Sequence, residues 1–254
     1  MEGKNALLKQ KHVVYSYEID VHGFIKPSIL LSYMLEGAWN HVRSTEFSYS
    51  HLLAEGQMWA ASRLLIVFNR LPKWNDEITV ETWGKGIDRF FALRDFVVRS
   101  STQEKLAVAT SAWLIIDRTT LRPQKLDKLR ETFPFHPGNS ALDVKLQKLH
   151  PVTEGKIRTR SVVRYTDLDV NRHVIASRYM RWILDSFSAD ILEGCSLKSF
   201  EIDFLSEAKL EDEIAVAIQP DYEYYLCTIS RESDGAELCR ARLTWGDFST
   251  SPPP

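Results

Sequence analysis

The sequence is poor in cysteine, which excludes several ways of holding a protein together. Among 254 residues there are three cysteines, Cys195, Cys227 and Cys239, an odd number with no Cys-x-x-Cys spacing. That pattern disfavours a disulfide framework or a structural zinc site and favours a reducing compartment. We therefore expect no metal.

Long hydrophobic runs are also lacking. The longest, such as Ala107–Ile116, have the length of a strand and fall well short of the roughly 20 residues that span a bilayer. The first residues, Met1–Gln10, are polar and contain neither a signal-peptide core nor an Arg/Ser-rich transit segment. We expect a cytoplasmic protein with no stable membrane insertion.

The sequence also lacks a large excess of positive or negative charge. The sequence has 32 Lys and Arg against 34 Asp and Glu, a formal charge of −2, which argues against nucleic-acid binding through phosphate neutralisation. The motifs of other chemistries are missing: there is no Gly-x-Ser-x-Gly elbow, no glycine-rich phosphate loop and no His-Glu-x-x-His. Hydrophobic residues make up 44% of the chain, enough to build a core and to exclude disorder.

What the sequence does contain is an internal repeat of five elements in one order. The first copy consists of Asp20-Val-His22, Pro27–Val42, Trp59–Phe68, Asn75–Glu81 and Leu106–Asp117. The second copy consists of Asp169-Val-Asn171, Val174–Leu192, Ser199–Ser206, Glu211–Ala217 and Ala236–Trp245. Two copies of one structural module explain this order better than a chance similarity of short motifs.

Each copy contains one helical pattern followed by several strand patterns. In Pro27–Val42 apolar residues recur at helical spacing, and Pro27 suits the first turn of a helix. Val174–Leu192 carries a matching stripe, whereas Ala107–Ile116 is almost continuously apolar, as in a buried strand. An antiparallel sheet wrapped around the helix would bury these apolar faces.

The predicted fold is therefore α+β, a double (tandem) hotdog in which each module wraps an antiparallel sheet around a long helix. We expect an N-terminal module over residues 1–117, a connector rich in proline and charge over residues 118–158, and a C-terminal module over residues 159–254.

Three alternating polar residues, Asp169, Asn171 and His173, stand directly before the second predicted helix. In an extended segment their side chains would point to one side, next to the free N–H groups of the helix start. A carboxylate, an amide, an imidazole and such donors suit hydrolysis of an acyl thioester by an activated water. The alternative is structural: Asp169 and Asn171 cap a turn or the helix, and His173 packs nearby.

A second carboxylate, Glu207, lies in the strand-like stretch Phe200–Lys209 and either faces the same cleft or is a solvated strand-end residue. The first copy has no counterpart of the Asn-x-His pair, so we expect it to shape a tunnel for the substrate. Candidate lining residues are Met34, Trp39, Trp59 and Arg63, for which simple core packing is the alternative.

The motifs resemble those of the acyl-acyl-carrier-protein thioesterases of plants and bacteria. The resemblance rests on Asp167–Val174 and Tyr179–Asp185 in the second copy, and on Trp74–Trp83 and Ala109–Asp117 in the first, and it extends over roughly residues 12–246. It implies a tandem hotdog that hydrolyses fatty acyl carrier protein to free fatty acid without a cofactor. Carried over by position, the family's catalytic Asp, Asn, His and Glu fall on Asp169, Asn171, His173 and Glu207.

Two features depart from the plant pattern. Ala208 replaces a cysteine, so no thiol can act there, and the chemistry must use water or, as a lesser alternative, attack by a carboxylate. Ile175 and Ala176 replace an asparagine pair, which leaves the orienting role of that pair without a counterpart.

Other functions stay open at this point. The acyl carrier could be coenzyme A, although basic residues such as Arg178, Arg181 and Lys128 would suit an acidic carrier protein. A non-catalytic acyl-binding hotdog is a further alternative. A dehydratase of this fold would need a His and a distant acid arranged around a Pro-Gly pair on a module helix. The Pro-Gly pair of this sequence, Pro137-Gly138, lies in the connector, which disfavours a dehydratase. Two fused hotdogs already bury a dimer-like face, so we expect a monomer or a homodimer.

Overall fold

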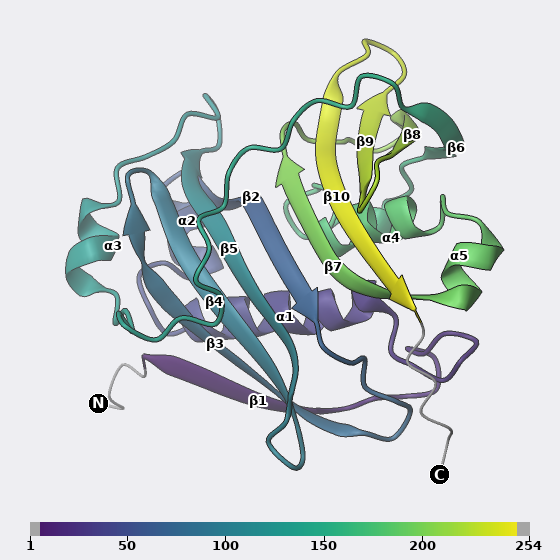
Figure 1. The fold of residues 1–254 in the computed structure, drawn as a ribbon. Coiled ribbons are helices and arrows are strands. Elements are labelled where there is room, and N and C mark those ends of the chain that lie inside the picture. The colour runs from purple at the N-terminus through teal and green to yellow at the C-terminus, as the bar shows by residue number, and fades with distance from the viewer. Residues whose placement is uncertain (1–5, 248–254) are drawn as a thin grey trace. The chain divides into compact units, whose positions relative to one another are not determined.

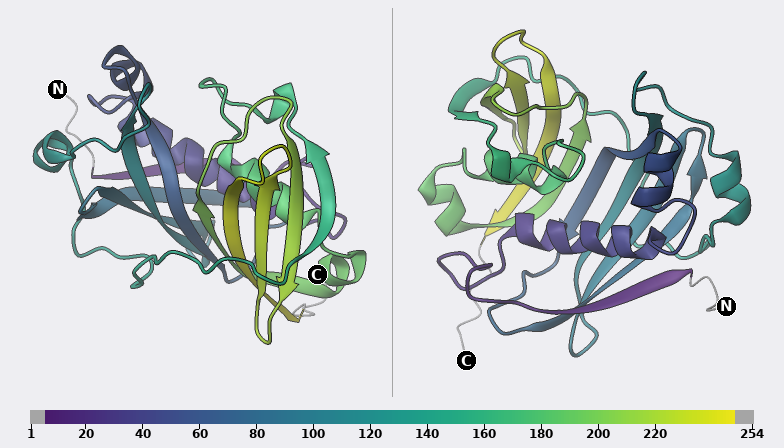
Figure 2. Two further views of the ribbon diagram at one scale, coloured as in Figure 1. Left: turned by 90° about the horizontal axis from the view of Figure 1, so that it is seen from above. Right: turned by 180° about the vertical axis from the view of Figure 1, so that it is seen from behind.

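The computed structural model describes residues 6–247 and divides into two compact units, Met1–Leu146 and Gln147–Pro254. In each unit an antiparallel sheet carries helices on one of its faces (Figures 1 and 2). The predicted α+β tandem hotdog is confirmed.

The first unit is built on five strands. They are β1 (Leu7–Val13), β2 (Gln57–Phe68), β3 (Glu77–Asp88), β4 (Phe91–Ser100) and β5 (Lys105–Asp117). Its helices are α1 (Pro27–Val42), α2 (Tyr49–Ala54) and α3 (Asp127–Thr132). The strands lie in the order β1-β3-β4-β5-β2, and every neighbouring pair is antiparallel.

Helix α1 lies across the sheet of the first unit (Figure 2, right) and has the bounds that the sequence predicts. Pro27 stands in its first turn, where no backbone donor is lost. The helix comes close to β3 at Gly37, where an added Cβ would lie 3.5 Å from the Thr82 methyl group. An alanine would fit here in ordinary van der Waals contact, so only a longer side chain would press against the sheet.

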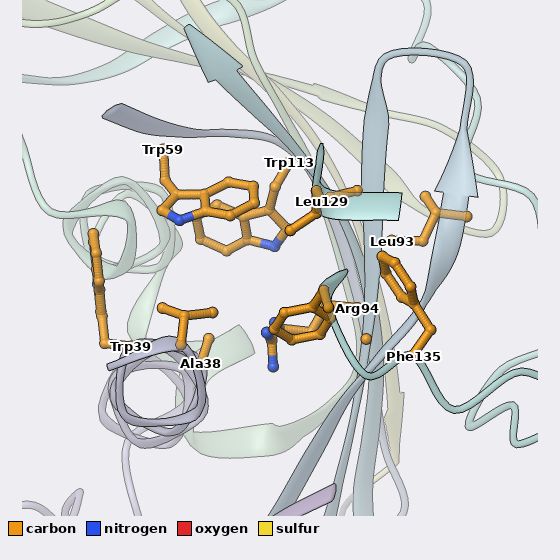
Figure 3. Close-up of a pocket in the computed structure, with 12 residues that line it drawn as sticks. Ala38, Trp39, Trp59, Leu93, Arg94, Trp113, Leu129 and Phe135 are labelled. Atoms are coloured by element: carbon orange, nitrogen blue, oxygen red, sulfur yellow. The ribbon is translucent and has the colours of Figure 1, made fainter. Parts of the chain in front are cut away.

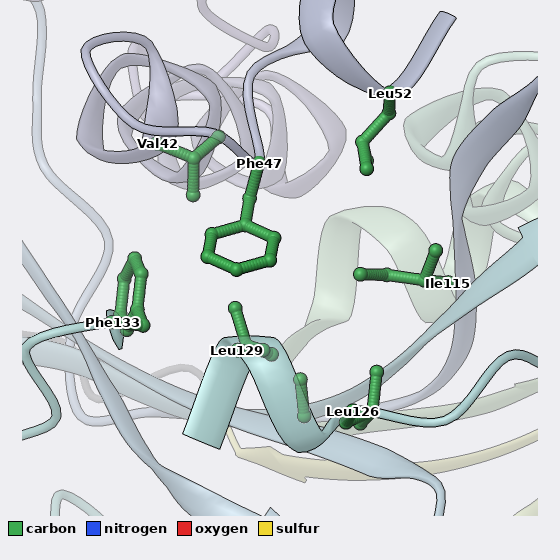
Figure 4. Packing of buried hydrophobic residues seen from close by; sticks show 8 residues of the cluster. Val42, Phe47, Leu52, Ile115, Leu126, Leu129 and Phe133 are labelled. Atoms are coloured by element: carbon green, nitrogen blue, oxygen red, sulfur yellow. The ribbon is translucent and has the colours of Figure 1, made fainter. Parts of the chain in front are cut away.

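The sequence suggested that the first unit ends at residue 117. In the structure the unit extends further, because part of the expected connector packs into it. Leu126, Leu129 and Phe133, on and beside α3, form one buried cluster with Val42 and Phe47 (Figure 4). Their spacing of three and four residues is that of a helix face. The prolines and charges around them concealed this short apolar pattern.

Buried side chains of the sheet hold the segment that follows. The Asp95 carboxylate, fully buried on β4, accepts the Ala141 N–H at 2.8 Å and lies 3.4 Å from the Lys85 ammonium group. The Trp83 indole N–H donates to the Asn139 carbonyl at 2.9 Å. These bonds explain why the first compact unit reaches Leu146.

The second unit has the same plan with shorter helices. Its strands are β6 (Lys156–Val162), β7 (Cys195–Phe204), β8 (Glu213–Pro220), β9 (Tyr225–Arg231) and β10 (Glu237–Asp247). Its helices are η1 (Tyr165–Asp167), α4 (Ala176–Leu184) and α5 (Ala189–Gly194). The strands lie in the order β7-β10-β9-β8-β6, all antiparallel. No helix within residues 6–247 is long and apolar enough to cross a membrane.

The single helix expected over residues 174–192 is interrupted in the structure. The Ser186 hydroxyl donates to the Trp182 carbonyl at 2.7 Å, a side-chain bond that competes with the helical pattern. Ser188 is extended, with ψ 154°, and the intervening Phe187 packs its ring edge against Tyr225. Local serine chemistry and one aromatic contact therefore divide the apolar stripe into α4 and α5.

A carboxylate braces the loop before the helix of the first unit. Asp20 Oδ1 accepts the backbone N–H of His22 at 2.9 Å and of Phe24 at 3.0 Å. The Asp20 N–H donates to the Phe24 carbonyl at 2.7 Å, and Gly23 takes φ 79°. The loop is thus a closed turn held by one aspartate.

The second unit repeats this loop bond for bond. Asp169 Oδ1 accepts the backbone N–H of Asn171 at 2.8 Å and of His173 at 3.1 Å. The Asp169 N–H donates to the His173 carbonyl at 2.8 Å, and Arg172 takes φ 66° where the first unit has glycine. The sequence repeat therefore reflects a repeated hydrogen-bond pattern.

We expect Asp20→Ala and Asp169→Ala to destabilise the protein by similar amounts, about 1–3 kcal/mol, because each leaves two N–H groups without their acceptor. Asp20→Asn and Asp169→Asn should cost less, since the amide oxygen can still accept both bonds. Urea unfolding followed by circular dichroism measures these losses.

Exposed Asp143 supplies the control, because Asp143→Ala should stay within about 0.5 kcal/mol of wild type. If all four loop variants were as stable as wild type, the carboxylates would not brace the loops.

Candidate functional site

The four candidate catalytic residues lie on two loops of the second unit. Asp169, Asn171 and His173 belong to the braced loop before α4, and Glu207 belongs to the loop after β7, which ends at Phe204. The sequence context of Glu207 suggested a strand, but the structure places this residue in a loop. In a strand the side chain of Glu207 would have to point to one face of the sheet, whereas in a loop its direction is not fixed in this way.

Two of these residues meet directly. His173 Nε2 lies 3.4 Å from Glu207 Oε2, and the two side chains are 31% and 35% exposed. An imidazole next to a carboxylate can pass a proton to or from a water molecule, and this exposure lets water reach both groups.

The alternation predicted for the braced loop appears in its burial, although the segment is a turn and not an extended strand. Asp169, Asn171 and His173 are half-buried, whereas Val170 is 73% exposed and Arg172 is exposed. The three polar residues thus share the inner side of the loop.

The carboxylate of Asp169 is engaged by its own loop. Oδ1 accepts two backbone N–H groups, which is the capping arrangement considered as the structural alternative. Asp169 therefore acts on the site at least through the position that it imposes on Asn171 and His173.

The loop that carries Glu207 is held by two residues that the sequence analysis did not single out. Arg231 donates to the Glu207 carbonyl at 2.6 Å and pairs with Asp212 at 2.9 Å. The Tyr179 hydroxyl accepts the N–H of Ala208 at 3.2 Å. Burial raises the pKa of Tyr179, so the hydroxyl stays protonated at neutral pH.

Of the two, only Tyr179 could have been suspected from the sequence, because it places a hydroxyl on the apolar stripe of α4. Arg231 lies 24 residues from Glu207, and no local pattern connects the two. The antiparallel sheet brings them together.

The basic residues expected to form a rim for an acidic partner have acidic neighbours. Arg178 Nε lies 3.3 Å from Asp167 Oδ1, and Arg181 Nε lies 3.4 Å from Asp185 Oδ2. In the first unit Lys128 lies 2.7 Å from a Glu46 carboxylate oxygen. Much of the positive charge at these positions is therefore balanced locally.

The first unit contains an aromatic cavity of about 500 Å³, its open mouth included (Figure 3). Its lining residues are Ala38, Trp39, Val42, Trp59, Gly84, Ala92, Leu93, Arg94, Trp113, Leu129, Phe133 and Phe135. A largely apolar pocket with one charged group is typical of a small-molecule site.

Two of the indole N–H groups around the cavity have acceptors within the protein, so the rings of Trp59 and Trp113 present mainly apolar surface. Trp59 Nε1 donates to the Phe47 carbonyl at 2.9 Å, and Trp113 Nε1 donates to the Ser111 hydroxyl at 2.8 Å. Gly84 permits the close packing of the wall, since an added Cβ would lie 2.7 Å from the Phe133 ring.

The four residues proposed for the tunnel divide between the cavity and the surrounding structure. Trp39 and Trp59 line the cavity, whereas Met34 and Arg63 are not among its lining residues. Met34 is fully buried in the core. Arg63 donates to the Leu146 carbonyl at 3.0 Å and lies over the Phe91 ring.

The other lining residues escaped the sequence analysis, and two of them, Trp113 and Arg94, show why. Trp113 lies in the apolar run of β5, where alternation was not visible. Arg94 did not stand out in the sequence, because its place beside an apolar cavity depends on the pairing of β4 with β3. Within residues 6–247, His, Cys, Asp and Glu side chains form no group of three or more that could hold a metal ion.

Comparison with known proteins identifies two family domains in the chain. Residues 5–131 match the acyl-ACP thioesterase N-terminal domain, and residues 150–247 match the acyl-ACP thioesterase C-terminal domain. The two compact units divide after Leu146, which lies between the end of the first match and the start of the second.

Curated relatives are plant enzymes of moderate similarity. The chain is 28% identical over 257 residues to the chloroplastic acyl-[acyl-carrier-protein] hydrolase FATB2 of Cuphea viscosissima, covering 94% of this chain and 62% of the relative. It is 27% identical over 266 residues to the chloroplastic palmitoyl-acyl carrier protein thioesterase of Arabidopsis thaliana, covering 94% and 64%. The chain thus spans less than two thirds of these relatives' length.

Two solved structures share the fold. An acyl-ACP thioesterase from Bacteroides thetaiotaomicron aligns with a TM-score of 0.86 at 22% identity, covering 97% of this chain and 100% of that one. The 12:0-ACP thioesterase from Umbellularia californica aligns with a TM-score of 0.85 at 23% identity, covering 96% and 98%. With both family domains matched in order, the chain belongs to the acyl-ACP thioesterase family.

Proposed function

We propose that the protein hydrolyses the thioester of a fatty acyl chain on acyl carrier protein and releases the free fatty acid. The observation that carries this proposal is the contact of His173 with Glu207 at 3.4 Å, in a chain of this family. A water-accessible imidazole and carboxylate are the groups that such a hydrolysis needs.

In the proposed mechanism Glu207 orients the imidazole of His173 by accepting its Nε2–H, and the other ring nitrogen takes a proton from water. The water oxygen forms a bond to the thioester carbonyl carbon, and the C–S bond then breaks. The proton on His173 passes to the departing sulfur, so that the carrier leaves as a thiol. Glu207 stabilises the transient imidazolium.

Asn171 and Asp169 have supporting roles in this proposal. The Asn171 amide orients the water or the carbonyl, and Asp169 positions Asn171 and His173 through the backbone bonds of its loop. Backbone N–H groups in the first turn of α4 stabilise the oxyanion, because a helix start favours negative charge.

Water is the proposed nucleophile because the thiols of the chain are poorly suited to attack. Burial raises the pKa of both Cys227 and Cys239, and a buried neutral thiol is a weak nucleophile. Ala208 stands next to Glu207, so no thiol is available at that position.

The aromatic cavity of the first unit is the proposed site of the acyl chain. Trp39 and Trp59 supply apolar surface to it, and a mainly apolar, aromatic lining is typical of small-molecule pockets. Met34 supports the cavity from the core in this proposal, and Arg63 fixes the segment that ends the unit.

We expect His173→Ala and Glu207→Gln each to lower kcat by about 10²- to 10⁴-fold, the usual contribution of acid–base groups. Asp169→Asn should lower it less, because the loop bonds survive. Thiol release from octanoyl to octadecanoyl carrier protein measures these rates.

The controls are His150→Ala and Glu193→Gln, two exposed residues of the same unit, which should retain wild-type rates. The same acyl chains on coenzyme A test the choice of carrier. Folded wild-type protein that releases no thiol from any carrier protein thioester above background would contradict the proposed function.

Filling the cavity should change the preferred chain length. Ala38→Leu adds three carbon atoms to the lining, so kcat/KM for the longest accepted chain should fall about 10-fold or more, while shorter chains are spared. Ala54→Leu, at an exposed position on α2, is the matched control. An unchanged chain-length profile in Ala38→Leu would show that the acyl chain binds elsewhere.

A further inference from the structure

The cavity of the first unit contains one charged side chain, Arg94, which is only 8% exposed (Figure 3). Its Nη1 lies 3.0 Å from His41 Nδ1 and donates to the Thr82 hydroxyl at 3.0 Å. Thr82 is neutral, and a histidine nitrogen that accepts from a guanidinium is neutral too. The positive charge therefore has no anionic partner in these contacts.

Several other arginines on the strands have a carboxylate partner. Arg99 pairs with Glu81, Arg231 with Asp212, and Arg240 and Arg242 pair with glutamates of their own unit. Among residues 6–247, no carboxylate lies within ion-pair distance of Arg94. The most deeply buried of these guanidinium groups is thus the one that lacks an anion.

Such a cation is costly to keep. Burial lowers the pKa of Arg94 to about 10, which still leaves it charged at neutral pH. An uncompensated buried charge destabilises a protein strongly, a cost that a well-packed apolar residue at the same place would avoid. A cation retained at a cavity wall is consistent with a ligand that supplies the missing acceptor.

The geometry leaves part of the guanidinium for that ligand. The contacts with His41 and Thr82 both use Nη1, so within residues 6–247 the N–H groups of Nε and Nη2 have no acceptor, and the side chain lines the cavity. Arginine N–H groups bind carboxylates and other oxygen acceptors with good directionality.

We propose that this cavity binds an aliphatic chain whose inserted end carries an oxygen acceptor, and that Arg94 binds that oxygen. The tryptophan and phenylalanine walls take the methylene groups, and Arg94 selects the end group. This inference extends the proposed function by naming the class of chain.

Two ligands share this chemistry: a free fatty acid inserted by its carboxylate, and an acyl thioester oxygenated at the end remote from the thioester. The oxygen at the inserted end is common to both, so binding of simple probes tests the proposal before the source is decided.

The first experiment measures the equilibrium binding of decanoate, decanol and decylammonium, using the fluorescence of the tryptophans that line the cavity. Wild-type protein should bind decanoate most tightly and decylammonium least. Arg94→Met should weaken decanoate binding by about 10- to 100-fold, the scale of a hydrogen bond to a charged group, without weakening decylammonium. Arg122→Met, at an exposed position of the same unit, is the control.

Circular dichroism establishes that the variants fold, and Arg94→Lys, which keeps the charge but not the planar fork, should bind decanoate with intermediate affinity. If Arg94→Met fails to fold, the wild-type preference for decanoate over decylammonium and the Arg94→Lys value decide. Equal binding of the two probes by wild type, or decanoate binding within twofold of wild type in Arg94→Met, would overturn the proposal.

A second experiment separates the two sources with carrier protein thioesters of dodecanoate and ω-hydroxydodecanoate. A lower KM for the hydroxylated chain that is lost in Arg94→Met identifies an oxygenated substrate. Equal KM values with inhibition by decanoate that is lost in Arg94→Met identify the free fatty acid. If neither thioester is hydrolysed while Arg94-dependent decanoate binding persists, the proposed function fails and the ligand class stands.

Discussion

A single aspartate that accepts two backbone N–H groups sets the form of the loop before the helix in both units. Asp20 does so in the first unit and Asp169 in the second, with bonds of 2.8–3.1 Å. Because the bonds run to the backbone, they fix where the following side chains stand without restricting what those side chains are. The candidate catalytic residues depend on this property of the loop.

The two units show what this freedom allows. The position that holds Phe24 in the first loop holds His173 in the second, and the backbone bonds to the aspartate are the same. The change from an apolar ring to an imidazole therefore costs the loop none of its bracing. One difference is unfavourable: Arg172 takes φ 66° where Gly23 takes φ 79°. A positive φ costs little for glycine but is strained for a residue that carries a Cβ. The brace must offset that strain.

The sequence predicted those features that depend on local pattern. Helix α1 matches its predicted range because proline and apolar spacing both define it. Features that depend on sheet pairing were missed: Arg231 supports Glu207 across 24 residues, and Arg94 lines the cavity because β4 pairs with β3. The connector was misjudged for a different reason, since Leu126 and Phe133 form too short an apolar pattern to stand out among prolines and charges.

Charge placement differs between the two parts of the proposed machinery, and physical chemistry suggests why. His173 and Glu207 are about one third exposed, so water can stabilise either charge while His173 takes up and releases a proton. Arg94 is almost fully buried beside His41 and Thr82, where solvent cannot compensate it. A group that must exchange protons needs contact with water, whereas a group that must select a ligand gains strength from its absence, because electrostatic attraction grows as the local dielectric constant falls.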